Sequence, residues 1–266
     1  MRANLIGIVA NSVSGPVAFD DSSPQGKALD WIVNLDPNYA CPEDPGLRSR
    51  YAMAVLYYST GGDRWTSCNA PNSGDAASQA VANANCPGGN AWLTGGSVCD
   101  WNFVSCDARN NVIEIDIGAC ALISPYFKLH ATLLTSDHSH NTDSNGLTGT
   151  LIVELQELQS LRQLKLQNGA IFGTIPDIFD SMTELEILDL DFNFIGGELP
   201  RSIYQLRNLV QLDLNHNRLQ GTISRNIGQL EQLKLLSLDN NRMSGQIPDE
   251  IGTLLLLGML LVVRSA

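Results

Sequence analysis

The stretch LDLNHNRLQGTIS, residues 212–224, carries Leu at positions 212, 214 and 219, which fits neither a helix nor a long alternating strand. The Leu, Asn and Gly positions of this stretch recur every 24 residues along the chain, and we call each set of recurring positions a column. Three columns show the step: Leu164, Leu188, Leu212, Leu236 and Leu260; Gly149, Gly173, Gly197, Gly221 and Gly245; and Asn145, Asn193, Asn217 and Asn241. A fixed period of this length indicates a solenoid, in which each unit packs on its neighbours.

Each part of the unit LxxLxxLxLxxNxLxGxIPxxI has a physical reason. The LxL strand points its two Leu side chains inward and the residues beside them outward, because successive strand side chains alternate faces. An Asn amide at the turn can bond the exposed backbone groups of the bend, so its repetition predicts a ladder inside the coil. Gly then permits a tight turn, and Pro ends hydrogen bonding on the return side.

This unit resembles the 24-residue leucine-rich repeat of the plant type, found in plant receptor ectodomains, polygalacturonase inhibitors and diatom and other algal surface proteins. The resemblance covers roughly residues 145–263, with a weaker unit at VIEIDIGACAL. In that unit Ile115 and Ile117 fill the strand columns, Cys120 the Asn column and Leu122 the column after it. The resemblance implies an α/β fold, a right-handed solenoid with a parallel sheet on its concave face and a helical N-terminal cap.

Two helical patterns precede the repeats. In SPQGKALDWIVNL, Ser23 is an N-cap candidate with Pro24 at the first helical position. In DPGLRSRYAMAVLYY, Asp44 and Pro45 repeat that start signal, and the Gly pair of STGGDRW ends the pattern. These helices would cover the first coil, whose apolar core would otherwise be exposed.

Three segments are expected from these patterns. Residues 1–22 form a disordered or targeting segment, 23–111 the helical, disulfide-containing cap, and 112–266 the solenoid, irregular at 121–144 and incomplete in its last repeat. The apolar run 254–263 is about half the length that a membrane helix needs, so we expect no membrane span in this chain. An incomplete last coil exposes apolar surface, which favours either a longer native chain or a homodimer through this coil.

All six Cys lie in the first half of the chain, at 41, 68, 86, 99, 106 and 120, which indicates a localised disulfide framework. CDWNFVSC resembles the CxWxGVxC of plant-type caps, with Phe103 in place of the usual Gly, and the resemblance implies a Cys99–Cys106 disulfide. Cys68 and Cys86 flank the insert 69–91 and would close it as a loop. Cys120 is expected to be a buried free thiol, and Cys41 stays unassigned. No CxxC spacing supports a zinc site.

Charge and motifs exclude several functions. The chain has 16 Lys and Arg against 28 Asp and Glu, a formal net charge of −12, which opposes binding to nucleic acid or anionic lipid. It has no GxSxG, HExxH, P-loop or kinase motif, so we expect no enzyme, cofactor or metal. The cluster Asp137, His138, His140 and Asp143 leaves open a metal-dependent enzyme using residues 137–143, although a polar surface excursion is the simpler interpretation.

The outward-facing columns of the sheet are the better candidate site. The candidate binding residues are Lys165, Gln167, Asp189, Asp191, Phe192, Asp213, Asn215, His216, Ser237 and Asp239. Four Asp on one surface favour a basic or polyhydroxylated partner, and Phe192 can stack on a peptide side chain or sugar ring. We therefore expect non-catalytic recognition of a protein, peptide or glycan by a secreted or cell-surface protein. An intracellular interaction scaffold is the alternative, favoured if the Cys residues are reduced in the native protein.

Overall fold

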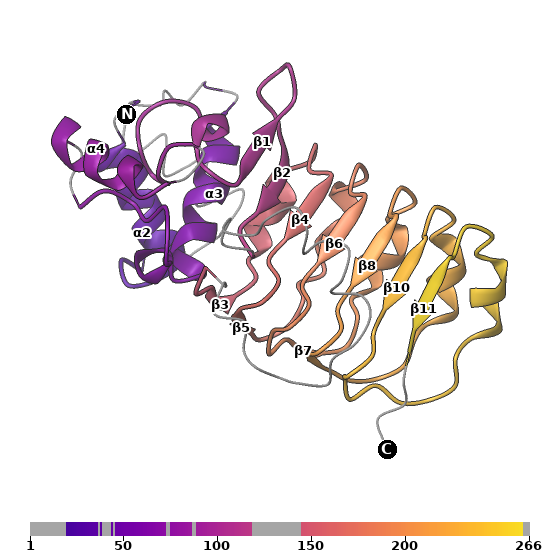
Figure 1. The fold of residues 1–266 in the computed structure, drawn as a ribbon. Helices are drawn as coiled ribbons and strands as arrows, with labels where there is room; N and C mark the ends of the chain where they lie inside the picture. The colour runs from indigo at the N-terminus through magenta and orange to yellow at the C-terminus, as the bar shows by residue number, and fades with distance from the viewer. Residues whose placement is uncertain are drawn as a thin grey trace.

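A computed structural model describes residues 20–36, 38, 44, 46–72, 75–86, 89–118 and 145–262. In these residues a helical cap is followed by stacked coils whose strands form a single seven-stranded sheet (Figure 1). The strands, in spatial order, are β1 (Val104–Cys106), β2 (Val112–Asp116), β4 (Gln163–Lys165), β6 (Ile187–Asp189), β8 (Gln211–Asp213), β10 (Leu235–Ser237) and β11 (Met259–Leu261). We call the solvent-facing side of this sheet the concave face.

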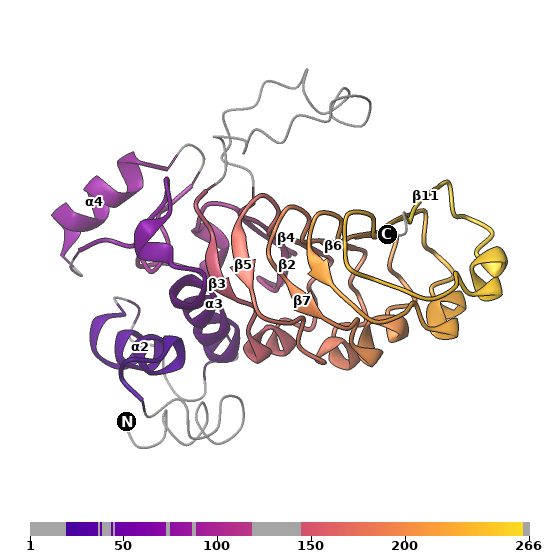
Figure 2. The same cartoon turned by 90° about the horizontal axis from the view of Figure 1, so that it is seen from below.

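The coils repeat the sequence period in space. From β4 to β11 the strands are parallel and Leu164, Leu188, Leu212 and Leu236 pair in register. The opposite side of the coils carries short 3-10 helices, η6 (Val153–Glu157), η7 (Phe179–Ser181), η8 (Arg201–Gln205), η9 (Arg225–Gln229) and η10 (Asp249–Thr253). Two small parallel sheets pair β3 (Thr148–Thr150) with β5 (Ala170–Phe172) and β7 (Gly196–Gly197) with β9 (Arg218–Leu219) (Figure 2). The α/β leucine-rich-repeat solenoid expected from the sequence is confirmed.

The Asn ladder forms as the repeat predicts. In Asn217, Oδ1 accepts from the Ile195 N–H at 2.9 Å, and Nδ2 donates to the carbonyl oxygens of Leu190 at 2.9 Å and Leu214 at 3.3 Å. Asn193 and Asn241 make the equivalent bonds one coil before and one coil after. Each amide therefore joins two coils through backbone groups that would otherwise be buried without partners.

The first coil begins with β2, in the weaker unit that the sequence indicated. Strand β2 pairs directly with β4, with Ile115 opposite Leu164, so no other strand lies between them. The Ala170 N–H donates to the Leu147 carbonyl at 2.7 Å, which places residues 145–161 in the coil that β2 opens. Asn145 therefore holds the ladder position of this coil, and its Oδ1 accepts from the backbone N–H of Ser67 at 3.0 Å. The irregular segment expected at 121–144 lies outside the described residues and stays a prediction.

Several sequence predictions fall on residues outside the described ranges, among them residues 1–19 of the expected disordered or targeting segment and the irregular segment 121–144. Cys120, expected in the ladder column, and the alternative metal cluster at residues 137–143 lie outside the described residues.

The cap begins with helix α2 (Pro24–Asp30), where Ser23 Oγ accepts from the Gly26 N–H at 2.9 Å, as predicted. A short π-helical turn, η3 (Trp31–Leu35), continues it. The second helix, α3 (Leu47–Ser59), starts later than expected, with Gly46 at the N-cap position. The Asp44 carboxylate instead accepts from the Gly46 N–H at 2.8 Å, so it stabilises the turn before the helix. The chain leaves α3 through Gly61, whose φ of +72° suits glycine.

A third helix, α4 (Ala76–Ala84), lies in the insert 69–91, for which the sequence analysis expected a loop. Asp75 starts it, because its carboxylate accepts from the backbone N–H groups of Ala77 and Ser78, both at 2.9 Å. The following AASQAVANA is rich in Ala, the strongest helix former. A capping residue before an Ala-rich run was therefore the signal that the sequence analysis missed.

The cap is closed by two disulfides and a buried ion pair. Cys68 is bonded to Cys86 and Cys99 to Cys106, the two pairs that the sequence indicated. Two further short 3-10 turns, η4 (Gly62–Arg64) and η5 (Val98–Asp100), complete the cap. Arg50 donates to both oxygens of Asp36, at 2.6 and 2.7 Å, and both side chains are almost fully buried.

The last coil exposes apolar side chains. Met259, Leu260 and Leu261 of β11 are 38–44% exposed, whereas Leu212 and Leu236 inside the stack are fully buried. A homodimer through this coil stays a prediction.

Candidate functional site

One outward-facing column of the concave face is unusually acidic. Strand pairing places five residues side by side across successive coils: Asp116, Lys165, Asp189, Asp213 and Ser237. Neighbouring strands of a sheet lie about 4.8 Å apart, so side chains in one column are within reach of each other. The sequence repeat predicted this column from Lys165 onward.

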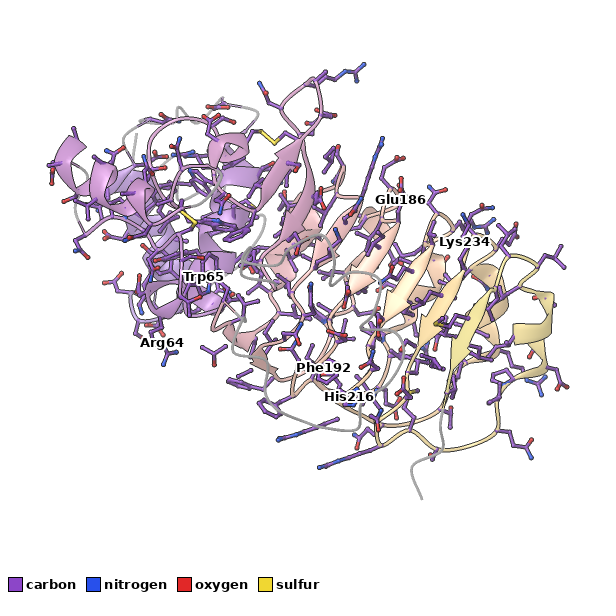
Figure 3. All side chains as sticks on the ribbon, viewed as in Figure 1. Arg64, Trp65, Glu186, Phe192, His216 and Lys234 are labelled. Atoms are coloured by element: carbon purple, nitrogen blue, oxygen red, sulfur yellow. A yellow bond between two sulfur atoms is a disulfide. The ribbon has the colours of Figure 1, made fainter. Side chains whose placement is uncertain are left out.

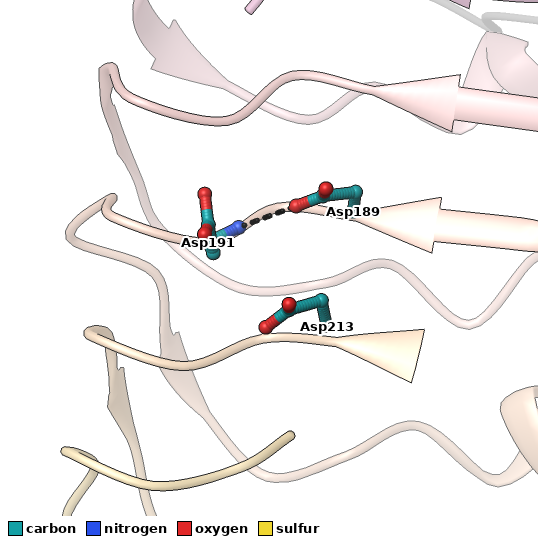
Figure 4. A group of neighbouring side chains, drawn as sticks. All are labelled: Asp189, Asp191 and Asp213. Carbon is teal, nitrogen blue, oxygen red and sulfur yellow. Dashed lines mark hydrogen bonds between the residues drawn. The ribbon is translucent and has the colours of Figure 1, made fainter. Parts of the chain in front are cut away.

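Three of the predicted carboxylates form a cluster (Figure 4). Asp189, Asp191 and Asp213 each place a carboxylate oxygen within 4.8 Å of the others. The backbone N–H of Asp191 donates to Asp189 Oδ1 at 3.3 Å. The Asn215 side-chain amide donates to Asp213 Oδ1 at 2.5 Å and to Ser237 Oγ at 3.2 Å, so it holds one side of the cluster. We call Asp189, Asp191 and Asp213 the carboxylate cluster.

The nearest Lys in this column already has partners. Lys165 Nζ lies 2.8 Å from Glu114 Oε1 and 3.4 Å from Asp116 Oδ2, both on β2. Burial by itself would lower the pKa of Lys165, but the hydrogen bond and charges of these carboxylates outweigh it and raise the pKa. Among the ion pairs of the described residues, none joins a basic side chain to the carboxylate cluster.

Burial and mutual repulsion change the acidity of the cluster. Burial, followed by the charge of Asp213, raises the pKa of Asp189 to about 7. Burial, followed by the charges of Asp189 and Asp213, raises the pKa of Asp191 to about 8. The pKa of Asp213 is raised as well, mainly by burial. Three carboxylates this close share protons near neutral pH, since ionising all of them would place like charges together in a partly buried site.

An aromatic pair lies at the end of these strands. Phe192 and His216 occupy equivalent turns in consecutive coils, with φ of +48° and +50°. Their rings stack with centroids 4.1 Å apart and an interplanar angle of 12°, and Phe192 is 44% exposed. Figure 3 shows both at one edge of the sheet, with Glu186 and Lys234 at the other edge. The pair therefore offers an aromatic surface at the rim of the acidic column.

The remaining predicted residues lie on the same face around the cluster. Ser237 donates to Asp239 Oδ1 at 3.2 Å, so the fourth predicted Asp belongs to the next coil and not to the cluster. Gln167 lies one repeat before Asp191, and its buried Oε1 has no hydrogen-bond partner among the described residues. Glu114 and Asp116 were not among the predicted residues, because the outward columns were taken from the regular repeats and not from the weaker unit that holds β2. They flank Ile115, which faces inward, so the alternation of faces along a strand could have placed both of them on the outward side.

Oxygen ligands of this kind suit hard cations such as Ca²⁺ and Mg²⁺, and the carboxylate cluster could supply three of them. The expectation of no metal stays a prediction. Among the described helices, none has the length and apolar character required to cross a membrane.

The family profile "Leucine rich repeat" matches residues 159–219, and a second profile, "Leucine Rich Repeat", matches residues 232–254. No curated protein sequence matches the chain significantly.

Similar solved structures include three from Arabidopsis thaliana. The BIR3–SERK2 complex is 28% identical over 59% of this chain and 71% of that chain, with a TM-score of 0.47. The leucine-rich-repeat ectodomain of the receptor kinase SOBIR1 is 27% identical over 60% of this chain and 79% of that chain, with a TM-score of 0.47. The ectodomain of the receptor kinase HAESA, in complex with an IDA peptide hormone, is 31% identical over 64% of this chain and 29% of that chain, with a TM-score of 0.49.

The 24-residue columns, the in-register parallel strands and the Asn ladder agree with both profile matches. Residues 159–219 and 232–254 of this chain are therefore leucine-rich repeats, and their sequence pattern is of the plant type.

Proposed function

We propose that this protein is a non-catalytic recognition module whose concave face binds a peptide or protein segment through a basic side chain. The carboxylate cluster is the observation that carries the proposal. Asp189, Asp191 and Asp213 approach within 4.8 Å, and the neighbouring Lys165 is paired with other carboxylates. A Lys or Arg side chain of a partner would supply the missing positive charge.

The aromatic pair defines a second contact beside the cluster. Phe192 is well exposed and its ring is held by stacking on His216, so it can pack against a neighbouring side chain of the partner with little loss of conformational freedom. The proposed ligand therefore combines a basic residue with an aromatic or apolar residue nearby.

Binding should depend on pH. A cationic group favours the ionised carboxylates, whereas the raised pKa values of Asp189 and Asp191, about 7 and 8, keep protons on the free cluster at lower pH. The ligand must then displace more protons at pH 6 than at pH 8. Affinity for the basic ligand should rise over this range.

Peptide selection tests this proposal. A random peptide library is panned on the whole chain at pH 8, and selected peptides are measured by calorimetry against wild type, Asp213→Asn and Asp180→Asn. The last variant is the matched control, since Asp180 is exposed in η7 on the opposite side of the coil. Selected peptides should share a Lys or Arg, and Asp213→Asn should weaken them about tenfold while Asp180→Asn has less than a twofold effect. Selection of acidic peptides, or equal effects of both variants, would contradict the proposal.

We place the protein outside the cell or on its surface, because disulfides such as Cys68–Cys86 and Cys99–Cys106 persist in oxidising compartments. The test is mass mapping of the endogenous protein after alkylation without reduction. Linked peptides for both pairs support export. Four alkylated thiols would instead support an intracellular interaction scaffold.

A further inference from the structure

A second surface lies beside the concave face, on the extended stretches that include β5, β7 and β9. We call each of these stretches, one per coil, a rung. Four stretches, residues 170–174, 194–198, 218–222 and 242–246, run parallel and are joined by backbone hydrogen bonds. For example, the Phe194 N–H donates to the Ile171 carbonyl at 2.8 Å, and the Arg242 N–H donates to the Leu219 carbonyl at 2.7 Å. Ile171, Ile195 and Leu219 point inward and are buried, so the residues on either side of them face solvent.

The solvent-facing positions hold rings and guanidinium groups. Phe172 is 52% exposed and Phe194 is 39% exposed, and Arg218 and Arg242 follow on the next two rungs, both exposed. We call these four residues the Phe–Arg row. Two large exposed rings on adjacent rungs are not needed for core packing, which Ile171 and its equivalents already supply.

The two Arg residues are available to a partner. The guanidinium carbon of Arg218 lies over the Phe194 ring, 4.5 Å from its centroid, in a cation–π contact that orients the group. Neither Arg218 nor Arg242 takes part in an ion pair in the part of the chain that the structure describes. The four rungs contain two Arg and one acidic residue, Glu198, in a chain whose formal net charge is −12.

We propose that the Phe–Arg row binds an acidic oligosaccharide, a chain of pyranose rings that carry carboxylates. The apolar C–H face of a pyranose packs on an exposed aromatic ring, and a guanidinium donates paired hydrogen bonds to a carboxylate. Rungs about 4.8 Å apart each present one of these residues, and the four follow a line oblique to the coils, since Arg218 lies opposite Gly196 and not opposite Phe194. This site has the opposite charge from the carboxylate cluster and goes beyond the recognition function proposed above.

Two other anionic partners fit the row less well. Nucleic acid carries a denser line of negative charge than one carboxylate per sugar ring, so a chain with a net charge of −12 repels it more strongly than it repels a uronic acid oligomer. An acidic peptide that adds a strand needs unpaired backbone groups, but the N–H groups of Phe194, Gly196, Arg218 and Gln220 already donate to the preceding rung.

The experiment measures binding of a defined uronic acid oligomer to the whole chain by calorimetry, beside the same oligomer with its carboxylates methyl-esterified. The variants are Arg218→Glu, Arg242→Glu and Phe194→Ala, with Arg225→Glu as the control. Arg225 is a strongly exposed Arg of η9, and its substitution changes the total charge by the same amount. Circular dichroism and thermal unfolding verify that each variant is folded.

The acid oligomer should bind wild type, and salt and esterification should each weaken it at least tenfold. Each Arg→Glu change in the row should weaken binding about tenfold and Phe194→Ala severalfold, whereas Arg225→Glu should have less than a twofold effect. No binding by wild type, equal binding of the ester, an equal loss in Arg225→Glu, or tighter binding of an acidic peptide would each overturn the proposal. Retention of basic-peptide binding by Arg218→Glu separates this result from the concave-face proposal.

Discussion

Replacing Asp191 by Asn should stabilise the protein at pH 8 and leave its stability unchanged at pH 4. Oxygens of the three cluster carboxylates lie within 4.8 Å, at which distance two unit charges repel by about 3 kcal/mol in a medium of effective dielectric constant near 20. Protonation relieves much of this repulsion, and the Asp191→Asn substitution removes the charge of one of the three side chains at every pH. One Asp191 oxygen is buried without a hydrogen-bond partner among the described residues, so the substitution breaks no bond at that atom.

The pH dependence follows from the direction of the pKa shift. The folded pKa of Asp191, about 8, exceeds its unfolded value of about 4, so the folded state binds more protons between these limits. Wild type is therefore favoured at low pH and loses stability as pH rises from about 4 to 8. The neutral amide does not titrate, and we expect Asp191→Asn to gain about 2 kcal/mol at pH 8, which corresponds to roughly 4–8 °C in Tm.

Urea unfolding followed by Trp fluorescence at pH 4 and pH 8 measures this difference. Asp180→Asn is the control, because its exposed carboxylate lies outside the cluster. An Asp191→Asn variant that is no more stable than wild type at pH 8, or that gains the same free energy at both pH values, would refute the electrostatic account of the cluster.

Three further predictions concern the fold. Asn217→Ala should lower the free energy of unfolding by about 2–4 kcal/mol in urea titrations, because the Ile195 N–H loses its acceptor inside the coil. Arg50→Ala should cost about 3–5 kcal/mol in the same assay, since the Asp36 carboxylate is left buried and unpaired; a loss below 1 kcal/mol would contradict this. Gly221→Ala should lower Tm by several degrees, because the φ of +81° strains Ala by about 1–2 kcal/mol; an unchanged Tm would show that this turn tolerates a side chain.

The sequence predicted the regular coils because their period is set by backbone geometry. A strand with two inward Leu, a turn whose amide satisfies the bend and a tight turn at Gly each fix a position in the unit, as Leu212, Asn217 and Gly221 illustrate. The outward column of Asp189 and Asp213 followed directly, because residues beside inward Leu must face solvent. Three of the four Asp grouped by sequence meet in the structure.

The first coil could not be predicted by counting. The 24-residue step breaks down in the irregular segment 121–144, so counting back from the regular repeats does not tell which strand lies beside β4. Tertiary packing decides instead that β2 lies against β4, which brings Glu114 and Asp116 to Lys165. The ion pairs of Lys165 with Glu114 and Asp116 depend on this long-range register.

The sequence also did not predict the backbone conformation of Phe103. Phe103, which stands where the resembling caps have Gly, adopts a φ of +69°. The sequence raised the question whether this turn would differ, and the structure shows that Phe takes a conformation usually left to Gly. Neighbouring packing decides this, because Phe103 lies against the apolar core of the cap.

A crystal structure of the chain with a selected peptide at pH 8 tests the central claim most directly. The account predicts a Lys ammonium or Arg guanidinium of the peptide within about 3.5 Å of carboxylate oxygens from Asp189, Asp191 and Asp213, with an adjacent side chain on the Phe192 ring. A peptide bound on the opposite side of the coils, or one that leaves the three carboxylates without a cationic partner, would contradict it.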